Sequence, residues 1–248
     1  MAIVYATELR WRGVHLHLSS VLAGAEGNVR TQTSISKCRI LQTGDRITAE
    51  APKQGVKGVW DADSRPCERV IYETEAGGIQ WRCFQPRSRT EVRIKNCTSK
   101  GDRTSKANRT IHGLGYAECL TVTVLPWSLP LKELRWGRFV SPRDSLVWVD
   151  WKGAYDTSFA MVNGEERELL SATGEEVATP EAKLRIGCGF TLREGRLRST
   201  ILPDVPALDK LLPGSLFRVE ETKWCSRGEM FSGNHSSSGW VIHEVVHW

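Results

Sequence analysis

The sequence predicts a mainly β protein, and three observations carry this prediction. Short runs of β-branched and aromatic residues recur along the chain, Gly, Pro and Ser residues separate these runs, and the periodicity of amphipathic helices is sparse. The chain has 248 residues, of which 40% are hydrophobic and 25% are charged. This length and composition suffice for a sizeable core and exclude wholesale disorder.

The predicted strands alternate or cluster β-branched residues. In chain order they are 14–18, 69–73, 91–95, 120–124, 146–151, 159–162, 183–186, 217–221 and 240–248. The pair Asn163-Gly164, directly after 159–162, is typical of a tight hairpin turn. Two short helices are predicted, one over 205–212, which Pro213 and Gly214 end, and one over 165–172.

Gly and Pro punctuation divides the chain into three regions. Residues 1–22 are expected to form a small N-terminal β-roll or hairpin, residues 23–179 an irregular middle region, and residues 180–248 a C-terminal β-sheet or ladder. No apolar run approaches the ~18 residues that span a bilayer. Glu8, Arg10 and Arg12 interrupt what would be the apolar part of a signal peptide, so none is predicted at the N-terminus.

The net charge of +5 is concentrated in one segment of the chain. Between Arg82 and Arg109, nine Lys and Arg residues stand against two acidic residues. We expect a solvated basic loop there, and the functional alternative is a patch for phosphate, anionic lipid or sulfated glycan. The candidate patch comprises Arg82, Arg87, Arg89, Arg93, Lys95, Lys100 and Arg103.

The seven cysteines are widely spaced and include no C-x-x-C pair, which excludes a zinc ribbon and a thioredoxin motif. Three sequons make Asn96, Asn108 and Asn234 candidate glycosylation sites. Because glycans and disulfides belong to the same oxidising compartments, the sequence indicates the endoplasmic reticulum lumen or the extracellular space. Cys188 and Cys225 flank the predicted C-terminal region and are the candidate disulfide pair.

The string His243-Glu244-Val245-Val246-His247 matches the H-E-x-x-H motif of zinc peptidases, which needs a helix to bring both histidines to one metal ion. Its β-branched residues instead predict a strand, on which the histidines face one side and Glu244 faces the other. His15 and His17 also share one face of a predicted strand, as a metal pair or as two solvent-facing side chains. We expect no metal, no cofactor and no catalytic constellation.

Several segments, in this order along the chain, resemble flavivirus non-structural protein 1, a secreted viral glycoprotein. They lie at 7–17, 120–124, 131–138, 156–166, 183–190 and 219–225. The first resembles the opening of that family's β-roll, 131–138 resembles part of its wing, and 183–190 resembles the entry to its β-ladder. The resemblance therefore implies a β-roll, a wing-like middle region and a ladder.

The resemblance also implies a function. It implies a non-catalytic glycoprotein of the endoplasmic reticulum lumen or secreted, which dimerises or forms higher oligomers, associates peripherally with membranes and contacts host or viral proteins, without binding specific nucleic acid. The implied membrane or dimer face comprises Leu9, Trp11, Val14, Leu16 and Leu18, for which core packing is the alternative. Two other functions stay open: a viral structural or attachment glycoprotein domain whose basic segment binds a receptor or anionic glycan, and a zinc hydrolase.

Overall fold

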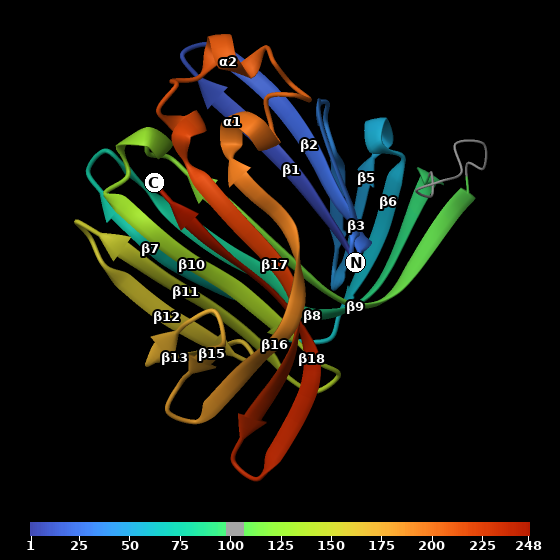
Figure 1. Cartoon of the computed structure of the whole chain (residues 1–248), viewed down its shortest axis with the longest axis vertical. Helices are drawn as coiled ribbons and strands as arrows, with labels where there is room; N and C mark the ends of the chain where they lie inside the picture. Colours follow the sequence, from blue (N-terminus) through green and yellow to red (C-terminus); the bar gives the residue numbers. More distant parts are fainter. Residues whose placement is uncertain (98–106) are drawn as a thin grey trace.

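The computed structural model describes residues 1–97 and 107–248 of the chain. Strands dominate these residues and form three antiparallel sheets, of three, six and nine strands (Figure 1). The predicted mainly β class is confirmed. In the described part of the chain, no helix has the length and apolar character needed to cross a membrane.

The first sheet is formed by the N-terminal residues. Its strands are β1 (Ala2–Trp11), β2 (Val14–Ala25) and β3 (Asn28–Ile35), paired in that order. Arg12 and Gly13 connect β1 to β2 with φ angles of 47° and 77°, the left-handed backbone that a two-residue hairpin turn requires. The turn fixes a register in which Glu8 lies opposite His17, so alternate residues of the hairpin face opposite sides.

The second sheet occupies much of the middle region, where regular strands replace the irregular structure we expected. Its elements are β4 (Arg39–Thr43), β5 (Arg46–Ala51), η1 (Pro52–Gln54), β6 (Val56–Ala62), β7 (Cys67–Thr74), β8 (Gly77–Cys97) and β9 (Ala107–Val122). The strand order is β4-β5-β6-β8-β7, and β9 pairs with β8. The predicted strands 69–73 and 91–95 lie within β7 and β8, and 120–124 overlaps the end of β9.

The third sheet contains the rest of the chain. Its strands are β10 (Leu131–Val140), β11 (Ser145–Gly153), β12 (Thr157–Val162), β13 (Glu165–Arg167), β14 (Ser171–Ala172), β15 (Glu176–Ala178), β16 (Ala182–Arg196), β17 (Glu220–Ser232) and β18 (His235–His247). The order β13-β12-β11-β10-β18-β17-β16-β15-β14 places the C-terminal strand β18 at the centre. The sheets divide the chain near residues 37 and 125, whereas the sequence indicated boundaries after residues 22 and 179.

Helices are confined to short turns. Within the described residues they are η1 between β5 and β6, η2 (Pro126–Ser128) before β10, and α1 (Leu197–Thr200), α2 (Leu208–Leu211) and η3 (Leu216–Arg218) between β16 and β17. The predicted helix 205–212 is reduced to the single turn of α2, because Pro206 and Pro213 bound it. The predicted helix 165–172 is wrong: Asn163 and Gly164, with φ of 53° and 85°, turn the chain back so that β13 pairs with β12.

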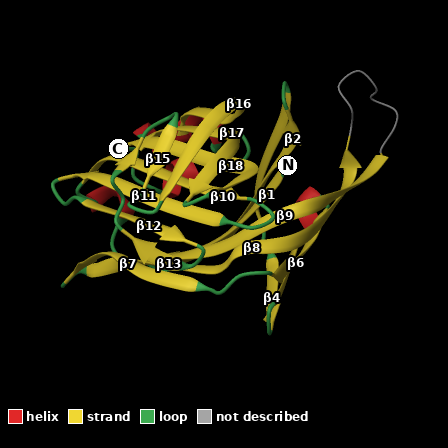
Figure 2. Cartoon of the chain, turned by 90° about the horizontal axis from the view of Figure 1, so that it is seen from below, coloured by secondary structure: helices red, strands yellow, loops and turns green. Residues whose placement is uncertain are grey.

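Apolar clusters join the three sheets in pairs. Trp81 packs against Trp136 and Phe159 between the second and third sheets. Val21 and Val92 belong to one cluster between the first and second sheets, and Leu22 and Leu192 belong to another between the first and third. Figure 2 shows the third sheet above β8 and β9, with β1 and β2 alongside. The sheets therefore surround a common interior.

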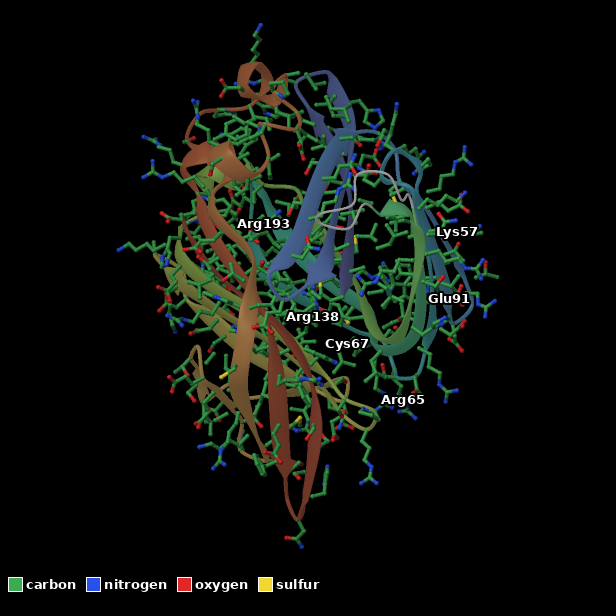
Figure 3. All side chains as sticks on the ribbon, turned by 45° about the vertical axis from the view of Figure 1, so that its right-hand side comes forward. Lys57, Arg65, Cys67, Glu91, Arg138 and Arg193 are labelled. Atoms are coloured by element: carbon green, nitrogen blue, oxygen red, sulfur yellow. The ribbon has the colours of Figure 1, made fainter. Side chains whose placement is uncertain are left out.

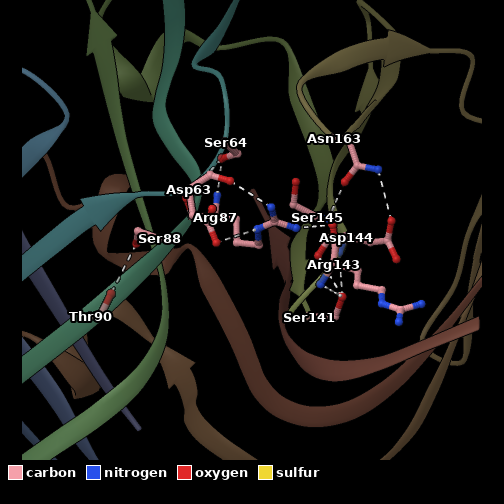
Figure 4. Close-up of polar contacts among 10 residues, drawn as sticks. All are labelled: Asp63, Ser64, Arg87, Ser88, Thr90, Ser141, Arg143, Asp144, Ser145 and Asn163. Atoms are coloured by element: carbon pink, nitrogen blue, oxygen red, sulfur yellow. Dashed lines mark hydrogen bonds and ion pairs between the residues drawn. The ribbon is translucent and has the colours of Figure 1, made fainter.

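Arg87 of β8 joins the second sheet to the turn between β10 and β11 (Figure 4). Its guanidinium donates to the backbone carbonyl of Arg143 and, at 2.8 Å, to that of Asp63. Its backbone N–H donates to Oγ of Ser64 at 2.8 Å. With only 17% of its side chain exposed, Arg87 is a structural residue of this junction rather than a free cation of the predicted patch.

Candidate functional site

A group of polar side chains from all three sheets meets in the interior, and we call it the interior polar cluster. Its members are Tyr5 on β1, Trp81 on β8, Tyr116 and Glu118 on β9, Arg138 on β10, Arg193 on β16, Glu221 and Lys223 on β17, and Glu244 on β18. Figure 3 shows Arg138 and Arg193 toward the middle of the molecule, between strands of the third sheet and the N-terminal hairpin.

The register of the third sheet brings the charged members to one face. Glu244 of β18 lies opposite Lys223 of β17, and Lys223 lies opposite Arg193 of β16. Glu221 points the same way as Lys223, because side chains two residues apart share a face. On the other side of β18, Arg138 of β10 lies two residues from the position that pairs with Glu244. Four neighbouring strands thus each direct at least one ionisable group into the interior.

Lys223 is the centre of the contacts in this cluster. Its Nζ lies 2.5 Å from Oε2 of Glu244 and 3.1 Å from Oε1 of Glu221, and it donates to the hydroxyl of Tyr5 at 2.7 Å. Arg193 donates to the other oxygen of Glu221 at 2.5 Å. The side chains of Lys223 and Glu221 are only 5% and 6% exposed. Such deeply buried charges persist only with close partners of opposite sign.

The two carboxylates beside Lys223 have pKa values displaced in opposite directions. Burial raises the pKa of Glu244, and the opposing attraction of Lys223 does not fully cancel that effect. Burial also acts to raise the pKa of Glu221, but the charges of Lys223 and Arg193 outweigh it and leave that pKa lowered. Burial acts to lower the pKa of Lys223, yet Glu244, Tyr5 and Glu221 raise it overall. Of these two carboxyl groups, Glu244 is therefore the one that is protonated at the higher pH, because its pKa is raised and that of Glu221 is lowered.

A second set of contacts surrounds Glu118 of β9. One of its carboxylate oxygens accepts hydrogen bonds from Tyr116 at 2.6 Å and from the indole N–H of Trp81 at 2.7 Å. Arg138 lies 3.7 Å from the other oxygen, with its guanidinium 4.9 Å from the ring centre of Tyr116. Burial raises the pKa of Tyr116, so this hydroxyl stays protonated.

Arg138 connects the two halves of the interior polar cluster. Burial acts to lower its pKa, but Glu118, Tyr116, Tyr5 and Glu244 together raise it, so the guanidinium stays charged. The carboxylate-bearing side chains of Glu118 and Glu244 keep 23% and 19% of their surface exposed. These two side chains are therefore less deeply buried than those of Lys223 and Glu221. Chemically, the arrangement offers a carboxyl group for proton transfer beside fixed cations that stabilise negative charge.

A separate pocket, which we call the side pocket, lies between the first and second sheets. Its volume is about 330 Å³. Val56, Ile94 and Ile111 supply apolar walls, and Arg30, Lys95 and Arg109 supply positive charge. Lys95 thus belongs to a pocket lining as well as to the predicted basic patch.

The other members of the basic patch lie mainly on a strand. Arg82, Arg87, Arg89, Arg93 and Lys95 are all part of β8, where we had expected a loop. Arg82 forms an ion pair with Glu68 at 3.0 Å, and Arg93 forms one with Glu91 at 2.6 Å. Lys100 and Arg103 fall outside the described residues.

The predicted disulfide is not formed. Cys188 is an exposed free thiol and Cys225 a buried one, so the two side chains have different surroundings. The structure instead places Cys67 of β7 directly opposite Cys83 of β8. Burial raises the pKa of Cys83, while a hydrogen bond with Cys83 lowers that of Cys67. Sequence spacing alone did not reveal this pair, because it depends on the β7–β8 register.

The predicted glycosylation sites occupy three different places. Asn96 is near the end of β8, Asn108 borders the side pocket, and Asn234 is exposed in the turn between β17 and β18. Use of these sequons stays a prediction.

The predicted membrane or dimer face is partly covered by the chain itself. Leu9, Trp11, Val14, Leu16 and Leu18 do share one face of the β1–β2 hairpin, as the register shows. Leu16 and Leu18 pack against an apolar cluster formed by Leu202, Val205, Leu208 and Phe217. The ring of Trp11 contacts that of Trp127 edge-on at 5.1 Å. Core packing therefore accounts for much of this face.

The C-terminal H-E-x-x-H string is extended, as predicted, within β18. His243 stacks on Trp224 with ring centroids 5.1 Å apart, and burial lowers its pKa to about 4. Glu244 points to the opposite face, toward Lys223. The zinc-hydrolase alternative is therefore wrong. The sequence indicated no role for Glu244 outside this motif. The structure places it in the interior polar cluster through its contact with Lys223.

Solved structures of similar fold match almost the whole chain. A putative AttH from Nitrosomonas europaea is 8% identical with a TM-score of 0.55, covering 98% of this chain and 85% of its own. CghA with Sch210972 is 10% identical with a TM-score of 0.52, covering 94% and 80%. Kievitone hydratase from Nectria haematococca is 10% identical with a TM-score of 0.50, covering 99% and 87%. No protein-family model and no curated protein sequence matches the chain.

These matches overturn the resemblance to flavivirus non-structural protein 1. The short segments that carried it are strands and turns, which recur in unrelated antiparallel proteins. The viral glycoprotein function, the attachment-domain alternative and the expectation of a non-catalytic protein were wrong as well, since a structure that shares this fold is named an enzyme. The predicted oligomer, membrane and protein partners and the predicted compartment stay predictions.

Proposed function

We propose that this protein is an enzyme that binds a small, mainly apolar organic molecule in the interior between its sheets and transfers protons to or from it. The observation that carries the proposal is the contact of Lys223 with Glu244 and Glu221, whose carboxyl pKa values are displaced in opposite directions. Paired groups with divergent pKa values are typical of acid–base sites.

The burial of these charges supports a functional role. Buried ion pairs contribute little to stability relative to well-packed apolar residues of similar size, because desolvation offsets their attraction. This β-rich fold has apolar clusters between each pair of sheets. It therefore does not need a cluster of charges for its stability, and chemistry is the better explanation for their presence.

In the proposed reaction, Glu244 is the general acid or base. Lys223 holds the Glu244 carboxylate in place and donates to Tyr5, whose own proton is then directed to the substrate. Arg138, which Glu118 positions, stabilises negative charge on a substrate oxygen. Leu134 and Ile242 lie on the same face as these groups and favour an apolar substrate.

The fold supports the same class of activity. Kievitone hydratase, one of the similar structures, bears the name of an enzyme that adds water to an organic molecule, and such additions require proton transfer. At 10% identity its substrate is not carried over, and the assignment to this chain rests on the interior polar cluster.

The test compares the protein with Glu244→Gln and, as matched control, Glu220→Gln, which changes an exposed acid on β17. Each protein is incubated in D₂O with a library of small apolar compounds, and products are followed by mass spectrometry. We expect at least one compound to be converted with incorporation of deuterium by the protein and by Glu220→Gln, but not by Glu244→Gln. Conversion that Glu244→Gln leaves unchanged would contradict the assignment of Glu244.

The side pocket favours a second candidate, non-catalytic binding of a small amphipathic anion. Its apolar walls and three cations suit a carboxylate with an apolar body. Replacing Arg30 and Arg109 by Gln should then weaken binding of such a compound, whereas Glu244→Gln should leave it unchanged. Isothermal titration calorimetry with a fatty acid separates the two candidates.

A further inference from the structure

We propose that Glu8, His15 and His17 form a binding site for a divalent transition-metal ion of the zinc type on the N-terminal hairpin. The proposal does not depend on the interior polar cluster. It also differs from the H-E-x-x-H string, whose histidines and glutamate face opposite sides of β18.

The three side chains converge from two paired strands. Glu8 of β1 lies directly opposite His17 of β2, and His15 shares the face of His17 because it is two residues away. Their ligand atoms all lie within 4.8 Å of one another. Nε2 of His15 is 2.9 Å from Oε1 of Glu8, and the two imidazole centres are 4.7 Å apart.

This donor set suits zinc. Two imidazole nitrogens and one carboxylate oxygen bind zinc at about 2.0–2.2 Å, with a further position open to water. Tetrahedral geometry then requires ligand atoms about 3.4 Å apart. Small side-chain rotations suffice to close the present separations, since the backbone pairing of β1 and β2 already holds the three residues together. All three side chains are partly or fully accessible, so a metal ion can enter from solvent.

Arg10 competes with the metal ion for Glu8. Its guanidinium contacts Oε1 of Glu8 at 2.5 Å, on the oxygen that also faces His15. The Arg10 side chain is 74% exposed, so it can turn into solvent when a metal ion binds. We therefore expect Arg10→Gln to tighten metal binding, because it removes both a competitor and a nearby positive charge.

The same chain contains a near copy of this arrangement that lacks one ligand. On β8 and β9, Glu91 lies opposite His112, and Arg93 lies opposite Thr110. Arg93 contacts Oε1 of Glu91 at 2.6 Å, and His112 lies 3.6 Å from Oε2. These four residues form a second quartet, in which Glu91, Arg93 and His112 correspond to Glu8, Arg10 and His17. Thr110 occupies the position that corresponds to His15. This second quartet is a built-in control, because it has the same carboxylate, arginine and histidine but only one imidazole.

The experiment titrates zinc, and cobalt(II) as a spectroscopic probe, into the full chain after dialysis against a chelator. We expect one equivalent of metal and the visible absorption of bound cobalt. His15→Thr, which converts the site into the second quartet, should abolish stoichiometric binding, and His17→Gln should do the same. His112→Gln should change nothing, and Thr110→His should create a second equivalent.

Three results would overturn the proposal. The dialysed protein could bind no metal, the His15→Thr/His17→Gln double variant could keep its full equivalent, or His112→Gln could lose as much as His17→Gln. Retained binding in the double variant would assign the metal to the thiols, of which Cys67 and Cys83 lie opposite each other. The thermal unfolding temperature of each metal-free variant controls for correct folding. Substitutions at exposed residues such as His15 should leave this temperature unchanged.

Discussion

The two faces of the β17–β18 strand pair hold buried polar residues in opposite ways. Toward the interior, Glu244 and Lys223 form a close ion pair with Tyr5 beside it. On the other face, His243 stacks on Trp224 and shares one hydrogen bond with Ser226, at 3.2 Å. His243 and Glu244 are neighbours in the sequence, yet different influences act on their pKa values. Burial alone lowers the pKa of His243 and keeps the ring neutral, whereas burial raises the pKa of Glu244 and the charge of Lys223 opposes that change.

This difference indicates that His243 contributes to packing, whereas Glu244 can take part in proton transfer. A buried histidine without a charged partner lowers its pKa and behaves as a flat aromatic side chain with one polar bond. A buried carboxyl group beside a protonated lysine keeps the capacity to gain or lose a proton. Substitutions on the interior face should therefore affect activity and stability together, and substitutions on the opposite face should affect stability alone.

The largest effect is expected from Lys223→Met. Removing this cation leaves Glu221 and Glu244 buried without their shared partner, which should lower the free energy of unfolding by about 3–5 kcal/mol. Urea unfolding measures the loss. The matched control is Lys183→Met, which breaks an exposed pair with Glu176 on the same sheet and should cost no more than about 1 kcal/mol.

A second variant tests whether unpaired buried charge causes the loss of stability in Lys223→Met. Adding Glu244→Gln to Lys223→Met removes one uncompensated charge and should restore part of the lost stability, a coupling that a double-mutant cycle measures. Equal losses for Lys223→Met and Lys183→Met would show that solvent screens the interior face and would remove the contrast between the two faces.

The next effect concerns pH and the opposite face. The pKa of His243 is about 4 in the folded chain and about 6.5 when unfolded, so the unfolded state binds more protons between these values. Its contribution is fully present above pH 6.5 and is lost as the pH falls toward 4, by up to about 3 kcal/mol. As the pH is lowered over this range, the urea midpoint of unfolding should fall less steeply for His243→Gln than for the unsubstituted protein. Parallel curves for the two proteins would contradict the neutral, buried state of His243.

The sequence predicts this strand and its two faces but not the partners on them. Alternation of β-branched residues is local, and it correctly placed residues 240–247 of the predicted segment 240–248 in a strand, with His243 and Glu244 on opposite sides. The register of β17 brings Lys223 to Glu244, and the packing of β1 on the third sheet brings Tyr5 to Lys223. These contacts depend on long-range pairing, which leaves no local pattern in the sequence.

The mistaken family resemblance has the same physical origin. Strand and turn segments such as 183–190 are compatible with many antiparallel sheets, so their order along the chain does not determine which strands pair. The placement of β18 between β10 and β17 determines the topology of the third sheet. Comparing short sequence segments does not reveal this placement. Likewise, Cys67 and Cys83 have no distinctive spacing but are directly opposed by the β7–β8 register.

The smallest effect on stability gives the sharpest comparison of the two faces. Tyr5→Phe removes the hydroxyl that accepts from Lys223, and Ser226→Ala removes the hydroxyl that bonds His243. Each deletes one buried or partly buried hydrogen bond, so each should lower the free energy of unfolding by about 1 kcal/mol. Only Tyr5→Phe should also reduce conversion of a substrate identified in D₂O, because Tyr5 belongs to the interior polar cluster and Ser226 faces away from it. A comparable loss of activity in Ser226→Ala would show that the two faces are coupled and that packing around His243 positions Glu244.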